Sequence, residues 1–223
     1  RISMERHAAQ AALAYIRDDM TIGLGSGKAV EYLIEFISME NYSNLKIVTN
    51  NMHTALLAKK RGLTIVPSWM NASLDYTFDT LDYLVKDLSG GMKNSEPVVQ
   101  NKILASMAKQ LIFMVSRDNF GVIEEEAIPF QVEVEKEALG YVNGRLKEMG
   151  AIVAEDSAEG RIPALSSNAN YILSAKIRWN KDLASLNNEL SDIPGIYATS
   201  LFTGLPVTAL IYDKQGVETI HAF

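Results

Sequence analysis

The chain has 223 residues, with 21 Lys and Arg against 27 Asp and Glu, a formal net charge of −6 and no cysteine. The absence of cysteine excludes disulfides, thiol nucleophiles and Cys-ligated metals. The acidic balance argues against nucleic-acid partners, which bind a basic face. The length suits one large domain or two modest ones, and the composition suits a reducing, cytoplasmic compartment. Residues 1–18 contain no apolar run long enough for a signal peptide or a membrane span, so we expect no membrane partner.

Helical and strand patterns alternate along the first half of the chain. Helices are expected at residues 4–16, 30–37, 52–61 and 98–108, and strands at 20–24, 45–49, 63–66, 74–78 and 111–115. In the second of these helices, apolar residues recur at the i, i+3, i+4 and i+7 positions of an amphipathic helix. Gly62 suits position C′ of the third helix. Strands that alternate with helices predict a parallel sheet with both faces covered.

After Asp118 the pattern changes. Residues 130–134 alternate apolar and polar side chains, which is typical of an antiparallel, half-exposed strand. Strands are also expected at 152–154 and 171–177, and helices at 139–149, ended by Gly150, and at 183–190. Final strands at 207–212 and 217–220 are expected to rejoin the first sheet. The predicted fold class is therefore α/β, with a Rossmann-like parallel-sheet domain (1–125 and 199–223) interrupted by a smaller α+β, ferredoxin-like domain (126–198).

A glycine-rich run, GLGSGK at residues 23–28, joins the first predicted strand to the following helix. Glycine lets backbone N–H groups approach a ligand closely, and a helix N-terminus favours an anion. The run is not a nucleotide P-loop, because Ile22 stands where its first glycine would be and Ala29 follows Lys28 in place of Ser or Thr. Two interpretations remain: phosphate binding, or a tight turn that needs glycine for its backbone alone.

Residues 20–29 (MTIGLGSGKA) resemble the start of the ribose-5-phosphate isomerase A family, in which the usual run is GLGTGST. Matching segments follow in order along nearly the whole chain: VTNNMHTALLAKKRG (48–62), LDYTFDTLDY (74–83), NKILASMAK (101–109), IPFQVEVEKEA (128–138), SSNANYIL (166–173) and IPGIYATSLF (193–202). The resemblance implies interconversion of ribose 5-phosphate and ribulose 5-phosphate in the pentose phosphate pathway. It also implies a homodimer or homotetramer that uses no metal or organic cofactor.

The family's reaction moves a proton between C1 and C2 through an enediolate. This chemistry needs a carboxylate base, donors for the enediolate oxygen and a cradle for the phosphate. The family's DGADE run is DTLDY here, and it keeps both aspartates, Asp79 and Asp82, for hydroxyl contacts and ring opening. Both follow an apolar strand, at the edge where parallel sheets bind ligands. The resemblance places the substrate phosphate at Gly25, Ser26, Gly27, Lys28 and Ala29.

The sequence departs from the family where the base is expected. In the family motif KGGGGxxxxEK the glutamate is the base, and Asn101 occupies its position here. An amide cannot abstract a proton at neutral pH. The motif's lysine falls on Met92, or on Ser89 if the glycine pair is matched, and Lys93 lies beside it as a substitute cation for substrate binding. Glu96 is the obvious substitute base.

Other departures leave three hypotheses open. Arg117 lies in the family's DxSK run, where it could replace the lost positive charge at the substrate. The family's TDNGN run is SSNAN at residues 166–170, and the three histidines show no metal-ligand spacing. The chain is an active isomerase with a relocated base, a divergent paralogue that binds a sugar phosphate with slow or no turnover, or a ligand-sensing or oligomeric module.

Overall fold

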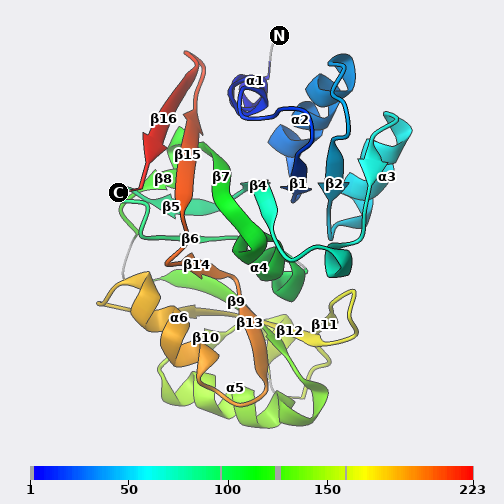
Figure 1. Ribbon diagram of the computed structural model, residues 1–223. Helices are drawn as coiled ribbons and strands as arrows, with labels where there is room; N and C mark the ends of the chain where they lie inside the picture. Colours follow the sequence, from blue (N-terminus) through cyan, green and yellow to red (C-terminus); the bar gives the residue numbers. More distant parts are fainter. Residues whose placement is uncertain (1–2, 96, 124–126, 159, 223) are drawn as a thin grey trace. The chain divides into compact units, whose positions relative to one another are not determined.

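The computed structural model describes residues 3–95, 97–123, 127–158 and 160–222 (Figure 1). The chain divides into two compact units, Arg1–Leu84 with Ile103–Phe120 and Leu205–Phe223, and Val85–Lys102 with Gly121–Gly204. The predicted boundary at 125/126 lies partly outside the described residues. Val85–Lys102 groups with the second unit, whereas the predicted division assigned this segment to the first domain.

The first unit is built on a seven-stranded sheet with the order β16-β15-β7-β4-β1-β2-β3. Its strands are β1 (Thr21–Leu24), β2 (Lys46–Val48), β3 (Thr64–Ile65), β4 (Leu74–Thr80), β7 (Ala108–Ser116), β15 (Val207–Tyr212) and β16 (Val217–His221). All neighbours are parallel except β15 and β16, which form an antiparallel hairpin at one edge. Long apolar runs, such as those of β7 and β15, are typical of strands that are covered on both faces. The predicted parallel sheet and the return of the last two strands to it are confirmed.

The helices of the first unit follow the predicted periodicity. They are α1 (Glu5–Leu13), α2 (Lys28–Met39) and α3 (Met52–Lys60), and α4 (Val98–Met107) contributes its second half. The predicted apolar positions of α2 (Val30, Leu33, Ile34 and Ile37) are buried in a core shared with α1, which lies beside it (Figure 1). Gly62 has φ +79° directly after the C-cap of α3, as its predicted position C′ requires. No helix within the described ranges is long and apolar enough to cross a membrane.

The second unit contains an antiparallel sheet with the order β10-β12-β9-β13, to which β11 adds by pairing with β12. Its strands are β9 (Ile128–Val134), β10 (Ile152–Val153), β11 (Ala164–Leu165), β12 (Tyr171–Ile177) and β13 (Ile196–Thr199), and its complete helices are α5 (Leu139–Glu148) and α6 (Leu183–Ser191). The predicted fold class is therefore confirmed. The predicted antiparallel pairing of β9 is confirmed. Its predicted half-exposed character is wrong, because no residue of this strand is exposed and Glu133 is 0% exposed.

A third, four-stranded sheet was not predicted. It has the order β14-β6-β5-β8, from β5 (Tyr83–Val85), β6 (Gly90–Met92), β8 (Phe120–Gly121) and β14 (Leu201–Thr203). These strands are short, and the two glycines of β6 are more typical of a loop than of a strand, so the sequence carries no strand signal there. Gly90 is needed there because a Cβ atom would lie 2.9 Å from the side chain of Leu183 on α6.

Ala169 has an unusual backbone conformation for a residue with a side chain. Its φ is +61°, in the left-handed region that favours glycine. It lies in the tight turn that leads into β12, where its N–H donates to the carbonyl of Ser166 at 2.9 Å. Ala169 also occupies the position of the glycine in the family's TDNGN run.

We expect Ala169→Gly to raise the free energy of unfolding by about 1 kcal/mol, because glycine adopts this conformation without strain. The measurement is urea unfolding followed by circular dichroism. Ala11→Gly, within α1, serves as the control and should lower the same free energy by about 0.5–1 kcal/mol. A loss of stability from both substitutions would contradict the strain assigned to Ala169.

Candidate functional site

The glycine loop, residues 25–27, connects the carboxyl end of β1 to α2. Gly27 is the N-cap of α2, with φ +116°, and its carbonyl accepts the first helical hydrogen bond from Glu31 at 3.1 Å. The N–H groups of the first helical turn, from Lys28 onward, therefore have no acceptor within the helix. They also form the positive end of the helix dipole. This arrangement suits an anionic ligand group.

The buried carboxylate of Asp79 fixes this loop to β4. Asp79 is 2% exposed, and its Oδ1 accepts hydrogen bonds from the N–H groups of Ser26 at 3.1 Å and Thr80 at 2.8 Å. The Thr80 hydroxyl donates to the carbonyl of Ser26 at 2.6 Å. From the other side, the Thr54 hydroxyl of α3 donates to the carbonyl of Gly25 at 2.7 Å. The loop conformation is therefore set by side chains from two neighbouring elements.

Close packing explains why the loop contains glycine. A Cβ atom on Gly25 would lie 2.1 Å from the Asp79 carboxylate, and one on Gly27 would lie 2.5 Å from the Thr80 hydroxyl. Real Cβ contacts are essentially never that short, so a larger residue would displace the loop from β4. The tight turn is therefore sufficient to explain the glycines. The same packing also positions the N–H groups at the N-terminus of α2, so it agrees equally with the phosphate-binding interpretation.

The other predicted residues of the first unit differ in exposure. Lys28 is exposed at the first position of α2, and Asp82 is exposed in the bend after β4. Ala29 is 1% exposed and its methyl group belongs to the hydrophobic core, so only its backbone N–H can contact a ligand. Of the two predicted aspartates, Asp79 therefore supports the loop, whereas Asp82 is accessible for contacts with a ligand.

In the second unit, Asn101 acts as an amide donor. It lies in the first turns of α4, is 3% exposed, and its Nδ2 donates to the carbonyl of Ser95 at 3.1 Å. A carboxylate cannot donate this hydrogen bond. The local structure thus uses the asparagine rather than merely tolerating it. Glu96, the predicted substitute base, lies outside the described residues.

Glu133 is a buried carboxylate that the sequence analysis missed. Its Oε2 accepts from the Asn170 amide at 2.8 Å and the Ser166 hydroxyl at 3.2 Å, and its Oε1 accepts from the N–H of Val99 at 3.4 Å. It therefore ties the first turn of α4, two residues from Asn101, to the turn before β12. The only sequence signal was a charged residue in a strand whose neighbours are apolar.

Two lysines of the second unit contact residues 199–201, where β13 ends and β14 begins. Lys93, the predicted substitute cation, follows β6, is 4% exposed and donates its backbone N–H to the carbonyl of Ser200 at 3.0 Å. Lys102 follows Asn101, and its Nζ donates to the Thr199 hydroxyl at 3.3 Å and to the carbonyl of Leu201. Burial lowers the pKa of Lys102 to about 8.

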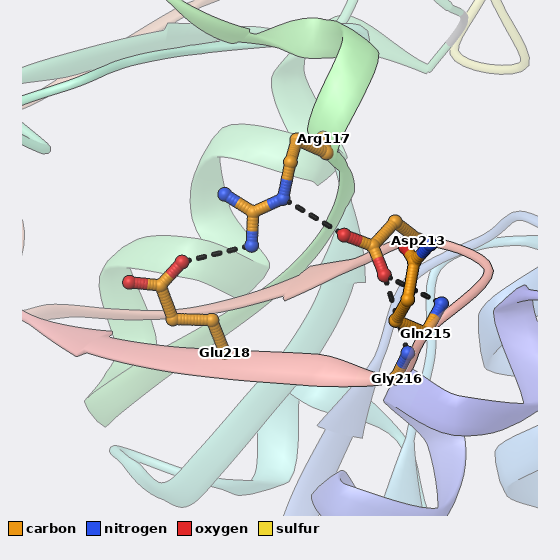
Figure 2. A network of polar contacts seen from close by, with 5 residues as sticks. All are labelled: Arg117, Asp213, Gln215, Gly216 and Glu218. Carbon is orange, nitrogen blue, oxygen red and sulfur yellow. Dashed lines mark hydrogen bonds and ion pairs between the residues drawn. The ribbon is translucent and has the colours of Figure 1, made fainter.

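Arg117 forms a network with the β15–β16 hairpin (Figure 2). Its Nε donates to Asp213 at 3.0 Å, and a terminal nitrogen donates to Glu218 at 2.8 Å. The same Asp213 carboxylate accepts the N–H groups of Gln215 at 2.8 Å and Gly216 at 3.2 Å in the hairpin turn (Figure 2). These contacts give Arg117 a structural role at the sheet edge, and the prediction that it binds substrate stays a prediction.

Fold and loop together define a mixed α/β protein with a glycine loop at the carboxyl edge of a parallel sheet. The profile of the family described as ribose 5-phosphate isomerase A (phosphoriboisomerase A) matches residues 46–216. The ribose-5-phosphate isomerase A of Pyrococcus abyssi is 25% identical over 226 residues, covering 98% of this chain and 97% of that protein. That of Methanothermobacter thermautotrophicus is 26% identical over 225 residues, with 99% and 98% covered.

Solved structures give the same fold. The ribose 5-phosphate isomerase A of Methanocaldococcus jannaschii superposes with a TM-score of 0.85 at 24% identity, covering 97% of each chain. A D-ribose-5-phosphate isomerase in complex with phospho-erythronic acid gives 0.89 at 23% identity, covering 99% of this chain and 100% of that one. The chain belongs to the ribose 5-phosphate isomerase A family, because the profile matches far more than half of its residues.

We expect the Asp213 carboxyl group to titrate below its ordinary value of 3.8, since the N–H of Gln215, the guanidinium of Arg117 and the N–H of Gly216 lower its pKa. The hairpin stabilisation from this carboxylate is present above about pH 4 and is lost as the pH falls through the lowered pKa. Carbon-detected NMR titration measures it. Arg117→Gln should raise this pKa only in part, because the backbone donors remain. An unchanged pKa in that variant would contradict the contact.

Proposed function

We propose that this chain binds a pentose 5-phosphate and interconverts ribose 5-phosphate and ribulose 5-phosphate, the reaction for which its relatives are named. The observation that carries the proposal is the glycine loop, which Asp79 holds at the start of α2, where the N–H groups of the first helical turn have no acceptor within the helix. Such a loop provides the phosphate cradle that the reaction requires. The homodimer or homotetramer and the cytoplasmic location that we expect from the sequence stay predictions.

In this proposal the substrate phosphate lies on the backbone N–H groups of the first turn of α2, from Lys28 onward, with the Lys28 side chain as the accompanying cation. The N–H groups of Gly25 and Ser26 hold the loop instead, because they donate to the Phe78 carbonyl at 2.9 Å and to Asp79 at 3.1 Å. Because the whole chain carries a net charge of −6, a phosphate must be held by local donors rather than by the overall field. The exposed carboxylate of Asp82 contacts sugar hydroxyls and assists ring opening. Asp79 acts through the loop, as a positioning residue.

Proton transfer between C1 and C2 is the step of the proposed reaction for which the expected carboxylate base is missing. By resemblance, the base position is held by Asn101, whose amide is already committed to the carbonyl of Ser95. Loss of a positioned general base costs roughly 10²–10⁴-fold in rate. This observation favours a second candidate function, a sugar-phosphate-binding protein with slow or no turnover.

Two other carboxylates are candidates for the base. Glu96 precedes α4 in the sequence, five residues before Asn101. Glu133 accepts three hydrogen bonds, from Val99, Ser166 and Asn170. A carboxylate so occupied suits a positioning role for α4 better than proton abstraction. We therefore propose Glu96 as the substitute base if the unaltered chain turns over.

We expect Asn101→Glu to increase turnover of ribose 5-phosphate at least tenfold, toward the roughly 10²–10⁴-fold contribution of a general base. The measurement is a coupled isomerase assay on the purified protein. Asn101→Gln is the matched control: it lengthens the side chain in the same way but keeps the amide, so it should give no gain. Equal rates for both folded variants would contradict the assignment of this position to the base.

Calorimetric titration of the unaltered chain with ribose 5-phosphate separates binding from turnover. Saturable heat without turnover supports the slow-binder candidate, and saturable heat with turnover supports the isomerase. If turnover is seen, Glu96→Gln should abolish it, and unchanged turnover would remove Glu96 as the base. The absence of both heat and a thermal shift at millimolar ligand would contradict the proposed function in either form.

A further inference from the structure

Two of the three N–H groups in the glycine loop already have partners. Gly25 is buried and its N–H donates to the Phe78 carbonyl at 2.9 Å, and the Ser26 N–H donates to the Asp79 carboxylate at 3.1 Å. The N–H of Gly27 has no acceptor among the described residues. Gly27 is also exposed, and a glycine presents only backbone atoms. The direction of this one N–H bond therefore decides what the loop itself offers to a ligand.

The carbonyl contacts of the loop fix the directions of its N–H groups. In a trans peptide group the C=O and N–H bonds point to opposite sides. The group between Gly25 and Ser26 agrees with this rule. Its carbonyl accepts from the Thr54 hydroxyl of α3 at 2.7 Å, while its N–H donates to Asp79 of β4. This peptide group therefore directs its N–H toward β4.

The next peptide group, between Ser26 and Gly27, is turned the other way. Its carbonyl accepts from the Thr80 hydroxyl of β4 at 2.6 Å. Its N–H, which belongs to Gly27, therefore points away from Thr80 and away from the sheet contacts that hold the rest of the loop. The hydroxyl of one residue on β4 thus sets the direction of the N–H that has no partner in the protein.

Gly27 is the residue at which this peptide group could rotate. Its φ is +116°, and glycine adopts positive and negative φ about equally readily, so the local chain alone does not select one orientation. The Thr80 side chain packs closely here, because a Cβ atom on Gly27 would lie 2.5 Å from its hydroxyl oxygen and 2.9 Å from its methyl group. In the family's DGADE run the corresponding residue is glycine, which has no hydroxyl to hold the carbonyl.

We propose that Thr80 is a positioning residue that turns the Gly27 N–H toward a bound phosphate. This donor directly precedes the N–H groups of the first turn of α2, which have no acceptor within the helix. A hydrogen bond to a charged acceptor is stronger than one to a neutral acceptor, so the contact favours a phosphate monoester over an uncharged sugar. The inference rests on the proposed function, because it takes the phosphate to lie at the start of α2.

The direction of the Gly27 N–H is tested first, on the intact, ¹⁵N-labelled chain without ligand. Residual dipolar couplings give the direction of this bond relative to α2. Thr80→Ser keeps the hydroxyl and should leave the direction unchanged. Thr80→Val has nearly the same shape but cannot donate a hydrogen bond, so the coupling should change as the peptide group takes up both orientations. An unchanged coupling in folded Thr80→Val would overturn the proposal.

Binding is then measured by calorimetric titration with inorganic phosphate and with ribose 5-phosphate. Thr80→Val should weaken both at least fivefold and by the same factor, since only a donor to the phosphate is affected. Thr80→Ser should bind as the unaltered chain does. Thr219→Val removes an exposed hydroxyl on β16 and should also leave both affinities unchanged. A clearly larger loss for ribose 5-phosphate than for phosphate would indicate general damage to the site and would overturn the proposal.

The role of Thr80 and the proposed function fail in different ways. If the unaltered chain binds both ligands and folded Thr80→Val binds them equally well, the role of Thr80 is overturned and the proposed function stands. If the unaltered chain binds neither ligand, the proposed function is contradicted, and the phosphate contact of Gly27 is overturned with it.

Discussion

The hydrogen bond from the Ser26 N–H to the Asp79 carboxylate is the contact on which the glycine loop depends. A buried carboxylate requires hydrogen bonds, and Asp79 obtains them from the loop and from its own strand. Only glycine at position 25 leaves space for that carboxylate. Two segments that are 53 residues apart in sequence therefore constrain one another. Their contact fixes where α2 begins and directs its first N–H groups to the edge of the sheet.

The second unit shows a related arrangement with a different chemical outcome. Glu133 connects α4 to the turn at residues 166–170 and so sets the orientation of the helix that carries Asn101. Asn101 then uses its amide to hold the carbonyl of Ser95. The helix that carries Asn101 is thus held by defined contacts, while an amide, unlike the carboxylate that the resemblance implies at this position, cannot take a proton. Family membership therefore does not by itself establish turnover in this chain.

The sequence predicted those elements that carry a clear local signal, such as a repeating apolar position, a continuous apolar run or a glycine at the end of a helix. The amphipathic period of α2, the apolar run of β7 and the glycine after α3 each specify one element, and the structure agrees. The third sheet was missed because its strands have two or three residues each, too few for a period. The burial of Glu133 was missed because its partners Ser166 and Asn170 are 33 and 37 residues away in sequence. The contacts of Arg117 likewise come from a hairpin about a hundred residues later.

A double-mutant cycle between Gly25 and Asp79 tests the central structural claim most directly. The free energy of unfolding is measured by urea denaturation for the unaltered chain, Gly25→Ala, Asp79→Ala and the double variant. Gly25→Ala alone should cost about 1–3 kcal/mol, because its Cβ atom overlaps the carboxylate. In the Asp79→Ala background that cost should fall by at least about 1 kcal/mol. Equal costs in both backgrounds would contradict the interlocking of the glycine loop with β4.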